Sequence, residues 1–170
     1  GGARFHLVSF EEGKAVVRRA YELGINYFDM ARSYGEGRAE DVYGAVIPEF
    51  RKHIFLTTKS GQRTRKGAAA DLETSLRKLR TDYVDLWQMH GVNRKEDLER
   101  SFGPGGAMEA FEAARKAGQC RFIGYTNCRD PEVHVAMLRH AQRFDTALMP
   151  LHVADTSFSE SPQMSFEKTA

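Results

Sequence analysis

Short runs rich in β-branched and aromatic residues alternate along this chain with longer segments in which apolar residues recur every three or four positions. The short runs predict strands, and the longer segments predict amphipathic helices with one face against a sheet. Strands are expected at residues 25–29, 54–58, 83–89, 121–126 and 146–150, with 5–10 as a weaker sixth. Strands that alternate with helices are typical of repeated βα units and a parallel sheet.

Glycine and proline mark several element boundaries. Gly24 and Gly118 follow helical segments, at the position where a left-handed residue commonly ends a helix. Asp130 followed by Pro131 predicts an N-cap and the first turn of another helix. The segment KEDLERSFGPGG is interrupted by its glycines and a proline, so it predicts a short helix and then a loop.

Polar side chains stand at the C-terminal ends of four consecutive predicted strands. In chain order they are Asp29, Lys59, His90, and the pair Thr126 and Asn127. An open doubly wound sheet gathers its ligand at one switch point, whereas a closed βα barrel brings the C-terminal ends of all its strands round one mouth. The pattern therefore favours an α/β fold of the (β/α)8 TIM-barrel type.

The barrel is expected to be incomplete, because about six βα units are counted where a full barrel has about eight. The partial barrel is assigned to residues 1–152. Residues 153–170 are polar and rich in serine, which predicts a loop or a disordered tail. An unfinished barrel has open edge strands, so self-association through those edges is expected.

Composition narrows the class of protein. With 41% hydrophobic and 28% charged residues, the chain has an ordinary globular composition. A net charge of +2 gives no argument for nucleic-acid or membrane binding, and we expect a cytoplasmic location. Cys120 and Cys128 are interpreted as thiols, with a disulfide left as the alternative. His134 and His140, six positions apart on one predicted helix, do not form a metal site.

The stretch YFDMARSYGEG joins a strand to a turn and contains both Asp29 and Tyr34. A phenol is a poor acid at neutral pH, and a nearby ammonium makes it a better one. Lys59 could supply that charge, Asp29 could hold Lys59 in place, and His90 could orient a carbonyl oxygen. Reduction of a carbonyl also needs a hydride, which a nicotinamide cofactor would provide. Taken singly, each residue also fits a structural role such as a turn cap or a solvated charge.

Four segments in this order resemble the signature segments of the aldo/keto reductase superfamily: GINYFDMARSYGEGRAEDVYG, IFLTTKS, LRTDYVDLWQMHG and RFIGYTNCRDP. The resemblance covers roughly residues 11–152. It implies a (β/α)8 barrel that reduces aldehydes and ketones with NADPH, with Asp29, Tyr34, Lys59 and His90 as the catalytic tetrad. It also implies that Thr126 and Asn127, together with Asp29, contact the nicotinamide end of the cofactor.

The chain also departs from the family pattern. Met30 stands where the family usually has threonine, and TALMPLH has no counterpart of the glutamine usually found beneath the nicotinamide. The barrel segments in which family members grip the cofactor phosphates are not found. Two functions therefore remain open: an NADPH-dependent oxidoreductase with a small carbonyl substrate and Tyr34 as proton donor, or a truncated, non-catalytic binding or interaction module.

Overall fold

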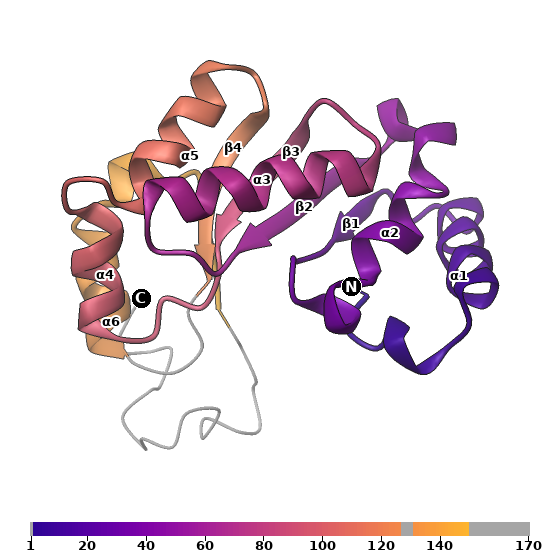
Figure 1. Cartoon of the computed structure of the whole chain (residues 1–170), viewed down its shortest axis with the longest axis horizontal. Helices are drawn as coiled ribbons and strands as arrows, with labels where there is room; N and C mark the ends of the chain where they lie inside the picture. The colour runs from indigo at the N-terminus through magenta and orange to yellow at the C-terminus, as the bar shows by residue number, and fades with distance from the viewer. Residues whose placement is uncertain (1, 127–130, 150–170) are drawn as a thin grey trace.

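A computed structural model describes residues 2–126 and 131–149, and its centre is a five-stranded sheet in the order β1-β2-β3-β4-β5 (Figure 1). Every neighbouring pair of strands is parallel. The strands are β1 (Tyr27–Asp29), β2 (Phe55–Ser60), β3 (Val84–Met89), β4 (Cys120–Thr126) and β5 (Thr146–Leu148). The five main predicted strands are thus confirmed within one or two residues at most ends.

Helices connect successive strands, as the βα pattern predicts. The α-helices are α1 (Phe10–Glu22), α2 (Ala39–Gly44), α3 (Arg65–Leu79), α4 (Lys95–Phe102), α5 (Ala107–Lys116) and α6 (Pro131–Leu138). Short 3-10 turns are η1 (Phe5–Leu7), η2 (Tyr34–Gly37), η3 (Ile47–Glu49), η4 (Arg51–His53) and η5 (Ala141–Arg143). The predicted tail at 153–170 lies outside the described residues. No helix in the described ranges has the length and apolar character needed to cross a bilayer.

The weaker sixth strand, expected at residues 5–10, is wrong. This segment forms η1 and then enters α1, which is opened by a capping box at Ser9. The Ser9 hydroxyl accepts a hydrogen bond from the backbone N–H of Glu12 at 3.2 Å, and the Glu12 carboxylate accepts one from the Ser9 N–H at 2.8 Å. These two bonds satisfy backbone donors at the start of the helix. The segment is therefore helical, although its apolar residues alone favour a strand.

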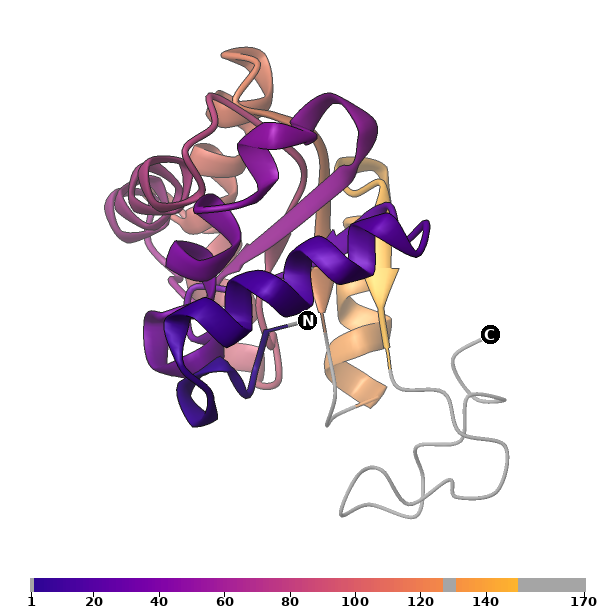
Figure 2. The same cartoon turned by 90° about the vertical axis from the view of Figure 1, so that its right-hand side faces the viewer.

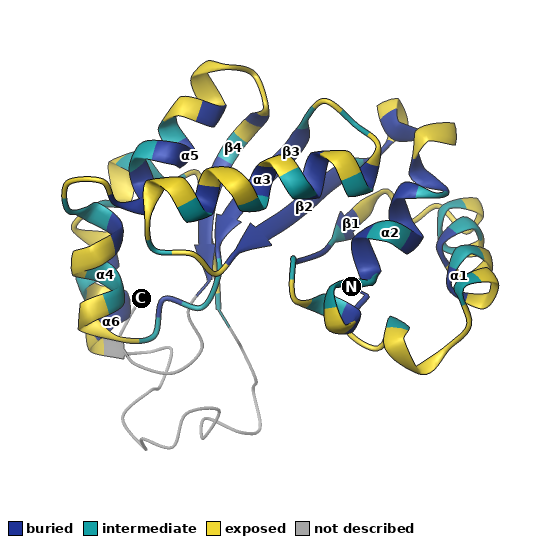
Figure 3. Ribbon diagram, viewed as in Figure 1, coloured by how far each residue is buried: buried dark blue, intermediate teal, exposed yellow. Residues whose placement is uncertain are grey.

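One face of the sheet is covered by helices. Figures 1 and 2 show α3 and α5 on the same side of the strands, and Figure 3 shows buried positions where these helices meet the sheet. The ring of Trp87 on β3 stacks on Phe111 of α5, with centroids 3.8 Å apart. Both side chains are almost fully buried, together with Leu72 and Leu79 of α3 and Ile123 of β4. This layer is the hydrophobic core, and it fixes the strands against the outer helices.

The opposite face of the sheet turns toward the interior of the partial barrel. Side chains alternate along a strand, so Phe55 and Lys59 share this inner face of β2. Tyr27 stacks on Phe55 at 5.1 Å between ring centroids, and Phe55 stacks on Phe122 at 6.1 Å. Aromatic rings from β1, β2 and β4 thus form a row on this inner face, nearer than Lys59 to the N-terminal ends of the strands.

Helices α2 and α3 meet at a very close backbone contact. A Cβ atom added to Gly44, the last residue of α2, would lie 1.9 Å from the carbonyl oxygen of Lys78. The obstacle is backbone, which cannot rotate away as a side chain can. Only glycine therefore fits at this crossing.

We expect Gly44→Ala to lower the free energy of unfolding by about 3 kcal/mol, because the added methyl group pushes the two helices apart. The matched control is Gly61→Ala, since an added Cβ there meets nothing within 4 Å and the residue has no positive φ. Urea denaturation of both variants measures the difference. Equal stability of the two variants would contradict the close contact.

Candidate functional site

The candidate site is built round the ammonium group of Lys59, whose residue is 1% exposed. Its Nζ donates hydrogen bonds to the Asp29 carboxylate at 2.7 Å, to the Met30 carbonyl oxygen at 2.8 Å and to the Tyr34 hydroxyl at 3.2 Å. An ammonium group has three N–H donors, so each can be matched to one oxygen. Lys59 lies inside β2, whereas the sequence analysis put it just after the strand.

Tyr34 is carried by a turn that is fastened to the sheet. The turn contains two left-handed residues, Gly35 and Glu36, which direct the chain back toward the sheet. Arg32, two residues before Tyr34, donates to the carboxylate of Glu40, a fully buried side chain on α2. Glu40 also accepts a hydrogen bond from the hydroxyl of Thr58 on β2 at 2.8 Å. The position of Tyr34 is therefore linked to the same strand that carries Lys59.

His90 is the first residue after β3, and its ring meets the ring of Tyr34 edge-on. The ring centroids lie 5.9 Å apart and the planes make an angle of 81°. Burial lowers the pKa of the His90 imidazole below its usual value, and the positive charges of Lys59 and Arg63 lower it further, while Asp29 opposes them. The imidazole is therefore neutral at neutral pH, with one ring N–H able to donate to an oxygen.

Thr126 ends β4 at the same edge of the sheet. Its hydroxyl oxygen accepts a hydrogen bond from the backbone N–H of Gly91 at 2.8 Å. That bond does not use the hydroxyl proton, which can still be donated to a ligand. Asn127, the other residue predicted to contact a cofactor, lies outside the described residues. The structure thus brings Asp29, Tyr34, Lys59 and His90 together, with Thr126 two strands from Lys59.

Two charged residues at this edge were missed by the sequence analysis. Glu40 is a fully buried carboxylate in the middle of the network behind Tyr34. Arg63 donates hydrogen bonds to the backbone carbonyl oxygens of His90 and Gly91. A buried charged residue has no distinct sequence pattern, because its burial depends on which strands and turns meet around it.

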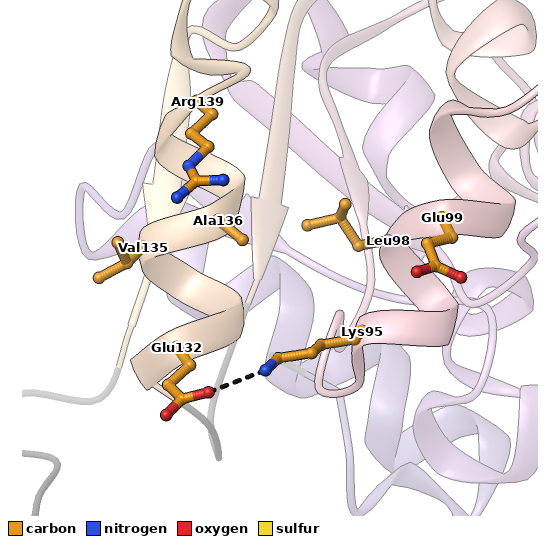
Figure 4. A pocket seen from close by; sticks show the side chains of 7 residues that line it. All are labelled: Lys95, Leu98, Glu99, Glu132, Val135, Ala136 and Arg139. Atoms are coloured by element: carbon orange, nitrogen blue, oxygen red, sulfur yellow. Dashed lines mark hydrogen bonds and ion pairs between the residues drawn. The ribbon is translucent and has the colours of Figure 1, made fainter.

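A separate groove lies between α4 and α6 (Figure 4). Its lining residues are Lys95, Leu98, Glu99, Glu132, Val135, Ala136 and Arg139. Lys95 and Glu132 form an ion pair at 2.9 Å across the groove. The lining carries charges of both signs and includes none of the predicted site residues, so the groove is distinct from the site at the strand ends.

Comparisons with known proteins agree on one family. The sequence matches the model described as "Aldo/keto reductase family" over residues 1–150. It is 34% identical over 133 residues to the uncharacterized oxidoreductase YqkF of Bacillus subtilis, covering 70% of this chain and 42% of that protein. It is 28% identical over 138 residues to the L-glyceraldehyde 3-phosphate reductase of Escherichia coli K12, covering 72% and 38%. The matched part of the chain therefore covers less than half the length of each of these relatives.

Solved structures share the fold. An aldo-keto reductase from Klebsiella pneumoniae in complex with NADPH matches with a TM-score of 0.73 at 26% identity, over 86% of this chain and 50% of that one. The holo form of an aldo-keto reductase from Bacillus halodurans gives 0.69 at 26% identity, over 84% and 49%. The incomplete barrel expected from the sequence is thus confirmed, with five strands described in place of about six units.

We expect Asp29→Asn to lower the free energy of unfolding by about 2 kcal/mol at neutral pH, because it leaves the buried Lys59 charge without an opposite charge. The loss should be smaller than for a fully buried pair, since the Asp29 side chain is 27% exposed. Glu11→Gln, which removes a surface pair with Lys14, is the control and should change stability little. If urea denaturation gives the same result for both variants, the Asp29 charge does not stabilise Lys59.

Proposed function

The chain belongs to the aldo/keto reductase family, and we propose that it acts as an NADPH-dependent oxidoreductase that reduces an aldehyde or ketone to an alcohol. The observation that carries the proposal is that one buried ammonium, that of Lys59, contacts both the Asp29 carboxylate and the Tyr34 hydroxyl. The Lys59 ammonium therefore lies beside the Tyr34 hydroxyl, where its positive charge can stabilise the phenolate that forms when Tyr34 gives up its proton.

The direction of the hydrogen bond supports Tyr34 as the proton donor. An ammonium group can only donate, so the Tyr34 oxygen accepts from Lys59 and its own proton points elsewhere. A carbonyl oxygen placed against that O–H can take the proton while the carbonyl carbon receives a hydride. The negative charge left on the Tyr34 oxygen is then stabilised by Lys59, and solvent returns the proton after product release.

Asp29 and His90 have supporting roles in this proposal. Asp29 holds the Lys59 ammonium by an ion pair at 2.7 Å and keeps it directed at Tyr34. His90, neutral at neutral pH, can donate its ring N–H to the same carbonyl oxygen that Tyr34 protonates. Two donors aimed at one oxygen would fix the orientation of the substrate and stabilise the negative charge that develops there.

The residues present fit the nicotinamide end of a cofactor. The Thr126 hydroxyl retains a proton for a carboxamide oxygen, and the side chain of Asp29 remains partly exposed at the mouth of the site. Asn127 is proposed as a further contact on the basis of its sequence position alone. When bound, a reduced nicotinamide supplies the hydride that no side chain can supply. The NADPH named with the Klebsiella pneumoniae structure supports this choice of cofactor.

We also propose that two copies of the chain associate through the edges of the sheet. In the described residues, β1 and β5 each pair with one neighbouring strand, which leaves backbone N–H and C=O groups of each strand available. Tyr27 on β1 and Leu148 on β5 are each about half exposed. A second copy would cover both the backbone groups and these apolar side chains.

The proposed reaction is tested by mixing the chain with excess NADPH and a small aldehyde and following loss of the reduced nicotinamide. We expect Tyr34→Phe and Lys59→Met to lower the rate by at least about 100-fold, since each removes part of the proton donor. Tyr21→Phe, which removes the hydroxyl of a tyrosine on α1 that stacks on Phe50, is the matched control and should leave the rate nearly unchanged. Near-normal turnover by Tyr34→Phe would refute the assigned acid. A folded wild-type chain without turnover would favour the non-catalytic module.

Association is tested by analytical ultracentrifugation over a range of protein concentrations. We expect the wild-type chain to form dimers or larger species, and Leu148→Lys to shift the population toward monomer, because a charge at an edge strand opposes pairing. Val16→Lys, at an exposed position on α1, is the control and should leave association unchanged. A wild-type chain that stays monomeric at every concentration would contradict edge pairing.

A further inference from the structure

Arg63 lies in the connection between β2 and α3, and its guanidinium group packs against the turn that follows β3. Its Nη2 donates hydrogen bonds to the carbonyl oxygens of His90 at 2.8 Å and Gly91 at 2.9 Å. Its Nη1 donates to the carbonyl oxygen of Gly61 at 3.1 Å, and its Nε lies 3.4 Å from Oδ1 of Asp97 on α4. Only 10% of the Arg63 side chain is exposed. One buried cation thus joins two connecting loops and a helix.

The turn after β3 depends on donors and acceptors from its neighbours. The His90 N–H donates to the carbonyl oxygen of Ser60 at 2.8 Å, and the Gly91 N–H donates to the Thr126 hydroxyl at 2.8 Å. Gly91 has a φ of +61°, so the backbone leaves the strand direction there. The carbonyl groups of His90 and Gly91 leave the strand ladder in a partly buried place and need another donor, which Arg63 provides.

Arginine suits this position better than lysine does. The guanidinium group is planar and presents several N–H donors in a fixed arrangement, so it can bind adjacent carbonyl oxygens while it faces a carboxylate. The ammonium of a lysine is a compact charge on a flexible stem and cannot reproduce this arrangement. The position of His90 therefore depends on the shape of the Arg63 side chain as well as on its charge.

We propose that Arg63 is a positioning residue that sets the ring of His90 relative to the hydroxyl of Tyr34 by holding the backbone of the turn after β3. This inference rests on the proposed function, in which His90 orients the carbonyl oxygen of the substrate. Arg63 acts through the His90 backbone, so it contributes to the geometry of the site without touching the reacting atoms.

Arg63 also bears on the protonation of His90. Burial is the main cause of the lowered pKa of the His90 imidazole, followed by the positive charges of Lys59 and Arg63, while Asp29 raises the pKa. Removal of the Arg63 charge should therefore raise the pKa of His90. This effect needs only the charge of Arg63, whereas the position of the His90 ring also needs the shape of its side chain, so a variant that keeps the charge separates the two contributions.

The test compares Arg63→Met, Arg63→Lys and wild type in the full chain. We expect Arg63→Met to lower kcat by about 10- to 100-fold, because small displacements of an orienting group are costly, and to change KM for NADPH by less than about threefold. An NMR titration should show a raised pKa for His90 and shifted backbone amides at His90 and Gly91. Arg63→Lys keeps the charge but loses the planar fork, so its His90 pKa should stay near the wild-type value while kcat recovers only in part. Arg65→Met is the control, since that side chain is 63% exposed, and it should match wild type in both measurements.

A folded Arg63→Met variant with unchanged kcat and unchanged amide shifts at His90 and Gly91 would overturn the proposal, whatever its His90 pKa. If Arg63→Met does not fold, Arg63→Lys decides, because a wild-type kcat with a wild-type His90 pKa would show that the fork is dispensable. Failure of the proposed function is distinguishable from failure of this inference. A wild-type chain that reduces no carbonyl would refute the proposed reaction, whereas the backbone amide shifts of His90 and Gly91 would still show whether Arg63 holds the turn.

Discussion

The arrangement of the strand ends follows from one constraint, the solvation of the buried Lys59 ammonium. An ammonium group removed from water requires oxygen partners, because an unpaired buried charge is too costly for a folded chain. The partners come from the end of β1, from the backbone of Met30 and from the turn that carries Tyr34. The same contacts that make burial of the charge possible therefore place the carboxylate and the phenol beside it.

Consecutive residues of β2 point to opposite faces of the sheet. Thr58 and Ser60 face the helices, where they bind Glu40 of α2 and Asp71 of α3. Lys59, between them, faces the interior of the partial barrel. Because the outer pair holds the helices in place, the strand that presents the ammonium cannot shift without breaking buried hydrogen bonds. The helix contacts of Thr58 and Ser60 therefore also fix the position of Lys59, the residue between them.

Periodicity made the five strands and the shared edge of their C-terminal ends predictable. It failed at residues 5–10, where the local hydrogen bonds of Ser9 and Glu12 stabilise the start of a helix. The contacts of Asp29, Tyr34, Lys59 and His90 were foreseeable because parallel strands bring their C-terminal ends together. The contacts of Arg63 were not foreseeable, because they depend on the left-handed conformation of Gly91 and on how two loops meet.

The consecutive order of the strands has a consequence for folding. Each strand pairs with the strand that precedes it in the chain, so every new pairing closes a loop of moderate length on a sheet already formed. Asp29 and Lys59 lie on the first pair of strands, Tyr34 lies in a turn between these strands, and His90 follows the third strand. Asp29, Tyr34 and Lys59 can therefore come together during synthesis once β2 has paired with β1, whereas the turn that carries His90 also needs Thr126 at the end of β4.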